Sequence, residues 1–65
     1  MNKYIYYKVI QGNYGNGWDS EDWHETNSQG FFTTPEARKN FNENLRLYRH
    51  NGGGVYRVVH IRELR

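Results

Sequence analysis

Cysteine is absent from this chain of 65 residues, and proline and methionine occur once each. Without cysteine there can be no disulfide bond and no thiolate metal site, and the absence is typical of proteins from reducing compartments. No apolar run approaches the roughly 20 residues of a membrane-spanning helix. The first residues, MNKYIYYKVIQG, also lack the long apolar segment of a signal peptide. We therefore expect a soluble, cytoplasmic protein.

The small size of the chain limits the stability that a core can provide. A domain of this length buries only about 60% of the surface that its unfolded chain exposes, and such domains usually gain stability from disulfides, a metal or a partner chain. Disulfides are excluded, and the three histidines, His24, His50 and His60, lie far apart in the sequence. We therefore expect a single domain, residues 1–65, that forms a homodimer.

Charge is distributed unevenly along the chain, although the net charge is only +2. Residues 1–34 contain two lysines against four acids, whereas residues 35–65 contain seven Lys and Arg residues against three Glu residues. Such polarity can steer a charged partner or orient two copies head to tail. The same charges are also typical of an ordinary solvated surface.

The first part of the chain, about residues 4–25, has the pattern of a β-hairpin. The segment YIYYKVIQ is rich in β-branched and aromatic residues and predicts a strand. The Asn16-Gly17 pair after it is typical of a tight turn with positive φ at both residues, whereas Gly12 and Gly15 indicate a bulge or a wider loop. Trp18 and Trp23 are five residues apart, so a regular return strand would place them on opposite faces. Either one ring is exposed or a β-bulge intervenes; we expect Trp18 in the core and Trp23 at the surface.

A helix is predicted over about residues 35–50. Thr34 can cap its N-terminus, and Pro35 suits its first position. Its apolar face comprises Ala37, Phe41, Leu45 and Tyr48, with Leu47 at the edge. The opposite, basic face comprises Arg38, Asn42, Arg46 and Arg49. Asn44 interrupts the apolar face, where it either hydrogen-bonds a buried group or marks a gap in the packing.

The segment NGGG ends the helix, and VYRVVHIREL predicts a last strand over about residues 55–62. The fold class is therefore α+β: a small two-layer domain of β-β-α-β order, with a three-stranded, mainly antiparallel sheet and the helix on one face. A strand order of 2-1-3 would place the first strand in the centre. The other face of the sheet then bears aromatic rings without a covering layer, which makes it a candidate dimer seam or ligand site.

Two segments near the ends of the chain, YYKVIQGNYGNGW and LRLYRHNGGGVYRVV, resemble a group of small uncharacterised bacteriophage and prophage proteins. Their pattern is a strand ending in a Gly-Asn-Tyr-Gly-Trp-like turn, a helix with a Tyr-Arg-Glu-Asn-like end, and a strand that begins with Tyr-Arg. The matching positions are Gln11, Gly12, Tyr14, Gly15, Gly17, Trp18, Leu45, Tyr48, Arg49, Asn51, Tyr56 and Arg57. His50 stands where the pattern has an acid, and the middle segment DSEDWHETNSQGFF departs from it. The resemblance implies a phage origin and the host cytoplasm as the location, and it implies no activity or site residues.

No segment has the spacing of a catalytic or metal site. GNYGNG lacks the lysine and the following helix of a phosphate-binding loop, and DSEDW lacks the EF-hand spacing for calcium. The histidines show neither HxxxH nor HExxH spacing, and no convincing serine or cysteine nucleophile accompanies them. We therefore predict a protein that is not an enzyme, with no catalytic residues, no cofactor and no metal ligands.

The hairpin is the first candidate binding surface. Trp23 is surrounded in the sequence by the acids Asp19, Glu21 and Asp22. In protein–protein contacts an indole ring often fills a pocket while charges around it steer the approach. The predicted function is therefore binding of a host protein through the acidic, Trp-bearing hairpin.

The basic helix face is the second candidate. Arg46 and Arg49 have guanidinium groups that match phosphate geometry, and Tyr48 and Tyr56 offer rings on which bases could stack. The alternative function is nucleic-acid binding, although no recognised RNA- or DNA-binding motif is present. A third hypothesis is a dimer that sequesters a small phosphorylated ligand at its seam. No membrane partner is expected.

Overall fold

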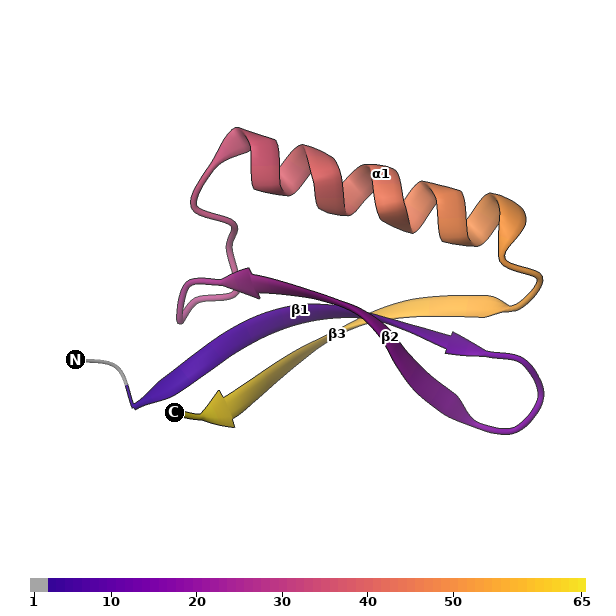
Figure 1. Cartoon of the computed structure of the whole chain (residues 1–65), viewed down its shortest axis with the longest axis horizontal. Coiled ribbons are helices and arrows are strands. Elements are labelled where there is room, and N and C mark those ends of the chain that lie inside the picture. Colours follow the sequence, from indigo (N-terminus) through magenta and orange to yellow (C-terminus); the bar gives the residue numbers. More distant parts are fainter. Residues whose placement is uncertain (1–2) are drawn as a thin grey trace.

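The computed structural model describes residues 3–65 as one sheet with a helix across one of its faces (Figure 1). The elements in chain order are β1, Tyr4–Asn13; β2, Trp18–Thr26; α1, Pro35–Asn51; and β3, Val55–Leu64. Both strand pairs are antiparallel, and the strand order is β2-β1-β3. The predicted α+β class, element order and strand order are confirmed, and each element ends one or two residues later than predicted.

The turn between β1 and β2 is the wider of the two predicted alternatives. Positive φ occurs at Gly15 (110°) and Gly17 (97°), and no residue other than glycine among residues 3–65 has it, so Asn16 does not. The side-chain Oδ1 of Asn13 accepts a hydrogen bond from the backbone N–H of Gly15 at 2.8 Å. The connection is therefore a four-residue loop with positive φ at two glycines, as the wider loop indicated by Gly15 predicted, and the tight Asn16-Gly17 turn is wrong.

The ends of α1 follow from local chemistry. Thr34 has an extended backbone, and its Oγ1 accepts a hydrogen bond from the N–H of Ala37 at 3.1 Å, which satisfies one free donor of the first turn. At the other end, the N–H of Gly52 donates to the carbonyl oxygen of Tyr48 at 2.8 Å. Gly53 then reverses the chain with a φ of 74°, a conformation that costs glycine nothing.

The core fills the space between α1 and the sheet. Its buried members are Ile10, Phe41 and Tyr56. Partly buried side chains that pack against them are Phe32, Leu45, Tyr48 and Val58. The predicted apolar face of the helix is therefore the face that meets the sheet. Leu47, predicted at its edge, is exposed.

Candidate functional site

A β-bulge in β2 determines which way the two tryptophans point. The β1–β2 register shifts between Ile10 and Gln11, so that Ile10 pairs with Asp22, Gln11 pairs with Ser20, and Glu21 has no partner. Such an extra residue reverses the alternation of the side chains that follow it. Of the two alternatives left open by the spacing of the tryptophans, a bulge is therefore the one that the structure contains.

Both indole rings consequently lie on the face of the sheet away from α1. Trp23 pairs with Val9 and Trp18 pairs with Asn13. These β1 positions alternate with Ile10, whose side chain is in the core beneath the helix. Trp23 is 42% exposed, as predicted, but Trp18 is also 37% exposed, so its placement in the core is wrong.

The tryptophans are the largest members of a continuous surface. We call it the Trp face, and it consists of Tyr7, Val9, Trp18, Trp23, Arg57 and Val59. The ring of Trp23 packs edge-on against Tyr7, with ring centroids 5.3 Å apart. Val9, in the central strand, is fully buried even though no second layer within residues 3–65 covers this face. In Figure 1 the side of the sheet opposite α1 carries no other element.

Arg57 fixes the second ring and joins all three strands. Its guanidinium carbon lies 4.1 Å from the centroid of the Trp18 ring, a cation–π contact. Its Nε donates to Oε1 of Gln11 at 2.9 Å, and Nε2 of Gln11 donates to Oγ of Ser20 at 3.1 Å. Sequence reasoning missed this role of Arg57. The alternation of β3 was the available signal, because it sets Arg57 on the side of Val55 and Val59.

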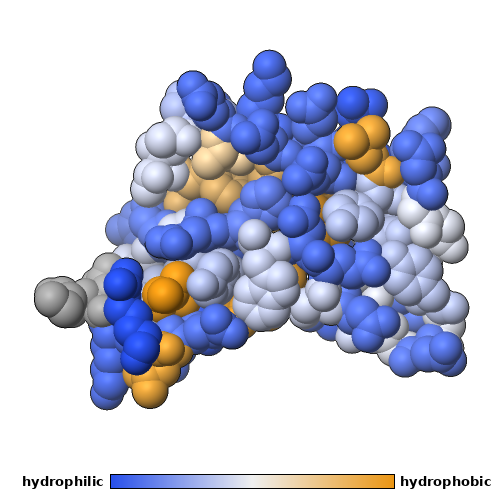
Figure 2. Space-filling view, viewed as in Figure 1, coloured by the Kyte–Doolittle hydropathy of each residue, from blue (hydrophilic) through white to orange (hydrophobic). Residues whose placement is uncertain are grey.

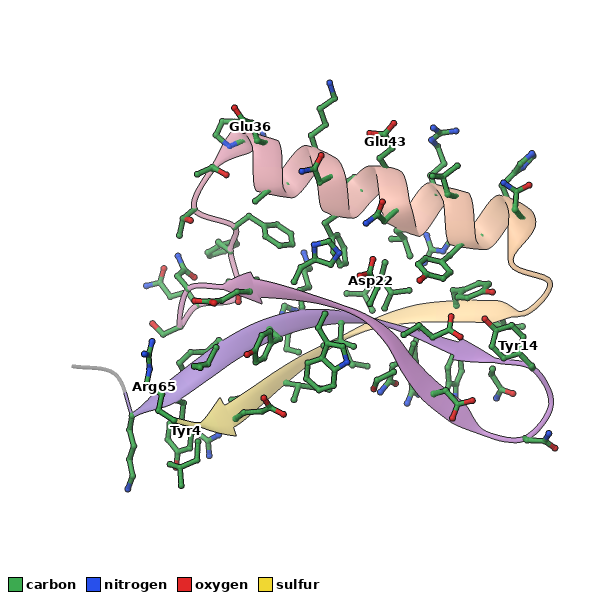
Figure 3. All side chains as sticks on the ribbon, in the orientation of Figure 1. Tyr4, Tyr14, Asp22, Glu36, Glu43 and Arg65 are labelled. Carbon is green, nitrogen blue, oxygen red and sulfur yellow. The ribbon has the colours of Figure 1, made fainter. Side chains whose placement is uncertain are left out.

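The acids predicted to surround Trp23 do not lie on the Trp face. Asp22 lies between α1 and the sheet (Figure 3). Its Oδ2 accepts a hydrogen bond from Nδ2 of Asn44 at 3.1 Å and lies 2.9 Å from Nε2 of His24. Asn44 is thus hydrogen-bonded to a partly buried group, the first of its two predicted alternatives. Asp19 is exposed and pairs with Gly12, on the helix side of the sheet.

Glu21 belongs to a tyrosine cluster beside the turn. Both carboxylate oxygens lie 2.8 Å from the hydroxyl of Tyr14, which donates to them, and the same hydroxyl is 2.7 Å from that of Tyr56. The hydrogen bond to Tyr56 and the nearby Glu21 carboxylate hold the pKa of Tyr14 well above its ordinary value of 10.0. Burial, with added repulsion from Asp22 and Glu21, raises the pKa of Tyr48.

Tyr14→Phe is expected to change how stability depends on pH. Because the folded-state pKa of Tyr14 is raised, its contribution is fully present below pH 10.0 and is lost as pH rises above that value toward the folded-state pKa. The difference in unfolding free energy between the wild type and Tyr14→Phe should therefore be constant up to pH 10.0 and should narrow between pH 10.0 and roughly pH 11.5. Urea denaturation at a series of pH values measures it. A constant difference across that range would show that the hydrogen bonds to Tyr14 are not coupled to folding.

The two arginines predicted to bind phosphate lie elsewhere again. Arg46 and Arg49 are exposed on α1, on the helix surface away from the sheet. The side chains along the outer side of α1 are mostly hydrophilic in Figure 2. Within residues 3–65, the one side-chain ion pair is His24–Asp22, so neither arginine has a carboxylate within 4.0 Å. The structure thus divides the predicted binding residues among the Trp face, the helix–sheet layer and the outer helix surface.

Comparison of the chain with protein-family models, curated proteins and solved structures gives no match. Among residues 3–65, no three His, Asp or Glu side chains form a group that could hold a metal ion. No helix in the same residues is long and apolar enough to cross a membrane. The geometry of the surfaces therefore carries the functional argument.

Proposed function

We propose that this chain is a small, non-enzymatic protein of phage or prophage type that binds a host protein through the Trp face. The observation that carries the proposal is the exposure of two tryptophans, Trp18 and Trp23, on one helix-free face of the sheet. Tryptophan and arginine are the residues most enriched among those that dominate protein–protein binding energy. Arg57 adds the second of these types to the same face.

The Trp face is also held ready for binding. Trp18 is stacked by Arg57, and Trp23 packs on Tyr7. Rings that are already ordered lose little conformational entropy when a partner covers them, so more of the contact energy remains as affinity. The central strand beneath them, with Val9 fully buried, provides a rigid support.

Charge beside the rings indicates the chemistry of the partner. In β2, Glu25 pairs with Tyr7 of the Trp face and is exposed near Trp23. We therefore expect a host-protein surface with an apolar depression for the indoles and basic residues around it. Glu25 acts at the rim, where it steers the approach, while the rings supply the buried contact.

The test is capture of a host protein that depends on the tryptophans. Tagged protein is incubated with bacterial lysate divided in two, one half treated with nuclease, and a protein retained in both halves is purified. Trp23→Ala and Trp18→Ala should each weaken its binding by about 30-fold or more, the effect of losing a dominant interface residue. Isothermal titration calorimetry with the purified partner measures the loss.

Leu47→Ala is the matched control, because Leu47 is a large exposed side chain on α1, outside the Trp face. It should leave the affinity unchanged. Far-UV circular dichroism must show the same fold in all variants. If Leu47→Ala and Trp23→Ala weaken binding equally, or if neither tryptophan matters, the Trp face is not the contact surface.

Nucleic-acid binding is the second candidate, favoured by the absence of ion pairs at Arg46 and Arg49 within residues 3–65. Material retained only in the lysate half without nuclease would support it. Arg46→Glu with Arg49→Glu should then abolish binding and spare any contact made by the Trp face. An empty result in both halves would favour the third hypothesis, a dimer that sequesters a small phosphorylated ligand.

A further inference from the structure

The outer edge of β3 is a strand edge with which no other strand pairs among residues 3–65. β3 is the terminal strand of the β2-β1-β3 sheet, spans ten residues, and pairs with β1 without any register shift. The other terminal strand, β2, carries a bulge and four acids. Bulges and like charges are the features with which proteins discourage pairing at an edge. β3 lacks a bulge, so it is the edge at which another strand can be added.

The direction of the backbone groups along β3 follows from one hydrogen bond. The N–H of Arg65 donates to the carbonyl oxygen of Lys3 at 3.1 Å, in register with the β1–β3 ladder. In an antiparallel pair the residues alternate between those that bond to the partner strand and those that point away. The odd-numbered residues therefore bond to β1, and Tyr56, Val58, His60, Arg62 and Leu64 present their N–H and C=O groups at the free edge.

The side chains of β3 are complementary to a second β3 in one register. When His60 lies opposite His60 of a second antiparallel copy, Arg57 lies opposite Glu63 of that copy, and Val59 lies opposite Ile61. The arginine and the glutamate are both exposed and share the face away from α1. In the single chain the guanidinium of Arg57 contacts Trp18 and Gln11, so in the dimer it exchanges these contacts for the carboxylate of Glu63 of the second copy. They meet in non-hydrogen-bonded pairs, in which opposite side chains are closest.

Other registers that use the same outward groups lose this complementarity. A register centred on Val59 sets Arg57 opposite Ile61, and one centred on Val58 sets it opposite Val59. A register centred on Ile61 sets Arg57 against Arg65, and one centred on Arg62 sets that arginine against itself. The register centred on His60 is the one in this series that forms opposite-charge pairs, and it forms two by symmetry.

We propose that two copies of the chain pair through β3, antiparallel and centred on His60, to form a continuous six-stranded sheet. Nine of the ten residues of β3, Tyr56–Leu64, take part, and they supply up to about ten backbone hydrogen bonds. On the helix side, the exposed Leu64 lies opposite the position of Tyr56 in the second copy. The two Trp faces lie on the same side of the joined sheet, but the dimer does not depend on the proposed host-protein contact.

The absence of cysteine permits a direct test of the register. Single cysteines are introduced at Val58, Val59, His60 and Ile61, and each purified variant is mildly oxidised at low micromolar concentration. His60→Cys should form a disulfide-linked dimer fastest, because only this residue faces its own copy at about 5.5 Å between Cα atoms. Leu47→Cys, on the exposed surface of α1, measures random collision. Crosslinking of His60→Cys no faster than Leu47→Cys overturns the proposal.

Charge exchange tests the pairing independently. In sedimentation equilibrium, Arg57→Glu and Glu63→Arg should each raise the dimer dissociation constant by roughly tenfold or more, because like charges then face each other. The double variant should return it to within about threefold of the wild-type value. Failure of that rescue, a wild-type chain that stays monomeric, or assembly that grows beyond a dimer would each overturn the proposal. Circular dichroism confirms that the three variants are folded, and no host protein is needed.

Discussion

Replacement of Phe41 by alanine is expected to unfold a large part of the protein at 25 °C. Phe41 is 2% exposed and lies at the centre of the core, with its ring centroid 5.2 Å from those of Phe32 and His24. The amino group of Lys8 also lies 5.4 Å from the centroid of its ring. Removing a buried phenyl ring costs about 3–5 kcal/mol, as lost burial and as a cavity. That is comparable with the whole unfolding free energy of a domain of this size, at roughly 0.05–0.15 kcal/mol per residue.

Urea denaturation followed by circular dichroism measures the effect. Leu47→Ala is the control on the same helix, and it should change the unfolding free energy by less than about 0.5 kcal/mol because Leu47 is 45% exposed. If Phe41→Ala unfolds at nearly the wild-type urea concentration, the helix is not held to the sheet by this ring. The aromatic side chains between α1 and the sheet would then not pack around Phe41 in the way that the structure shows.

Gly52→Ala is expected to destabilise the protein by about 1–3 kcal/mol, the range for an overpacked core. The reason is not the backbone, since Gly52 has an ordinary φ of −82°. At such a position, alanine in place of glycine normally stabilises, because it restricts the unfolded chain. Here an added Cβ would overlap the hydroxyl of Tyr56 and would lie 2.5 Å from the carbonyl oxygen of Tyr48. Tyr56 is 7% exposed and bonded to Tyr14, so it has little room to move.

Gly53→Ala separates this steric effect from backbone strain. Gly53 has a φ of 74°, yet a Cβ there would meet no atom within 4 Å. Its replacement should therefore lower the unfolding free energy only by the cost of placing alanine in the left-handed conformation, about 1–2 kcal/mol. It should leave the tyrosine cluster intact. Near-UV circular dichroism reports the tyrosines: we expect it to change in Gly52→Ala and not in Gly53→Ala. Identical near-UV spectra for the two variants would refute the contact with Tyr56.

Most of the fold was predicted correctly from local sequence patterns, because helix caps and apolar periodicity depend on only a few neighbouring residues. The cap at Thr34 and the apolar face around Phe41 depend on spacing within one helix, and both are confirmed. The central position of β1 followed from apolar residues on both of its faces. The turn was predicted less well, because Gly15 and Gly17 provide alternative hinges and the sequence alone does not choose between loop lengths.

The candidate site depended on pairing between strands. Along β2 the five-residue spacing of Trp18 and Trp23 is compatible with opposite faces or with one face, and only the register against β1 decides. Because Glu21 is unpaired, both indole rings lie on the same side of the sheet. Asp22 lies on the opposite side, beneath the helix, where it accepts a hydrogen bond from Asn44. The hairpin was predicted to present its tryptophans and acids on one surface. In the structure they lie on two surfaces, with the tryptophans on one and most of the acids on the other.

The sequence by itself determined the single α+β domain, the order of its elements and the absence of disulfides, because composition and short-range periodicity set these properties. Only the tertiary structure decided which side chains share a surface. The Trp18–Arg57–Gln11 contacts join three strands, and Tyr14, Glu21 and Tyr56 meet across 42 residues of chain. The physical reason is that a side chain in a strand alternates between two environments, so one extra residue in a neighbouring register exchanges the environment of every residue after it.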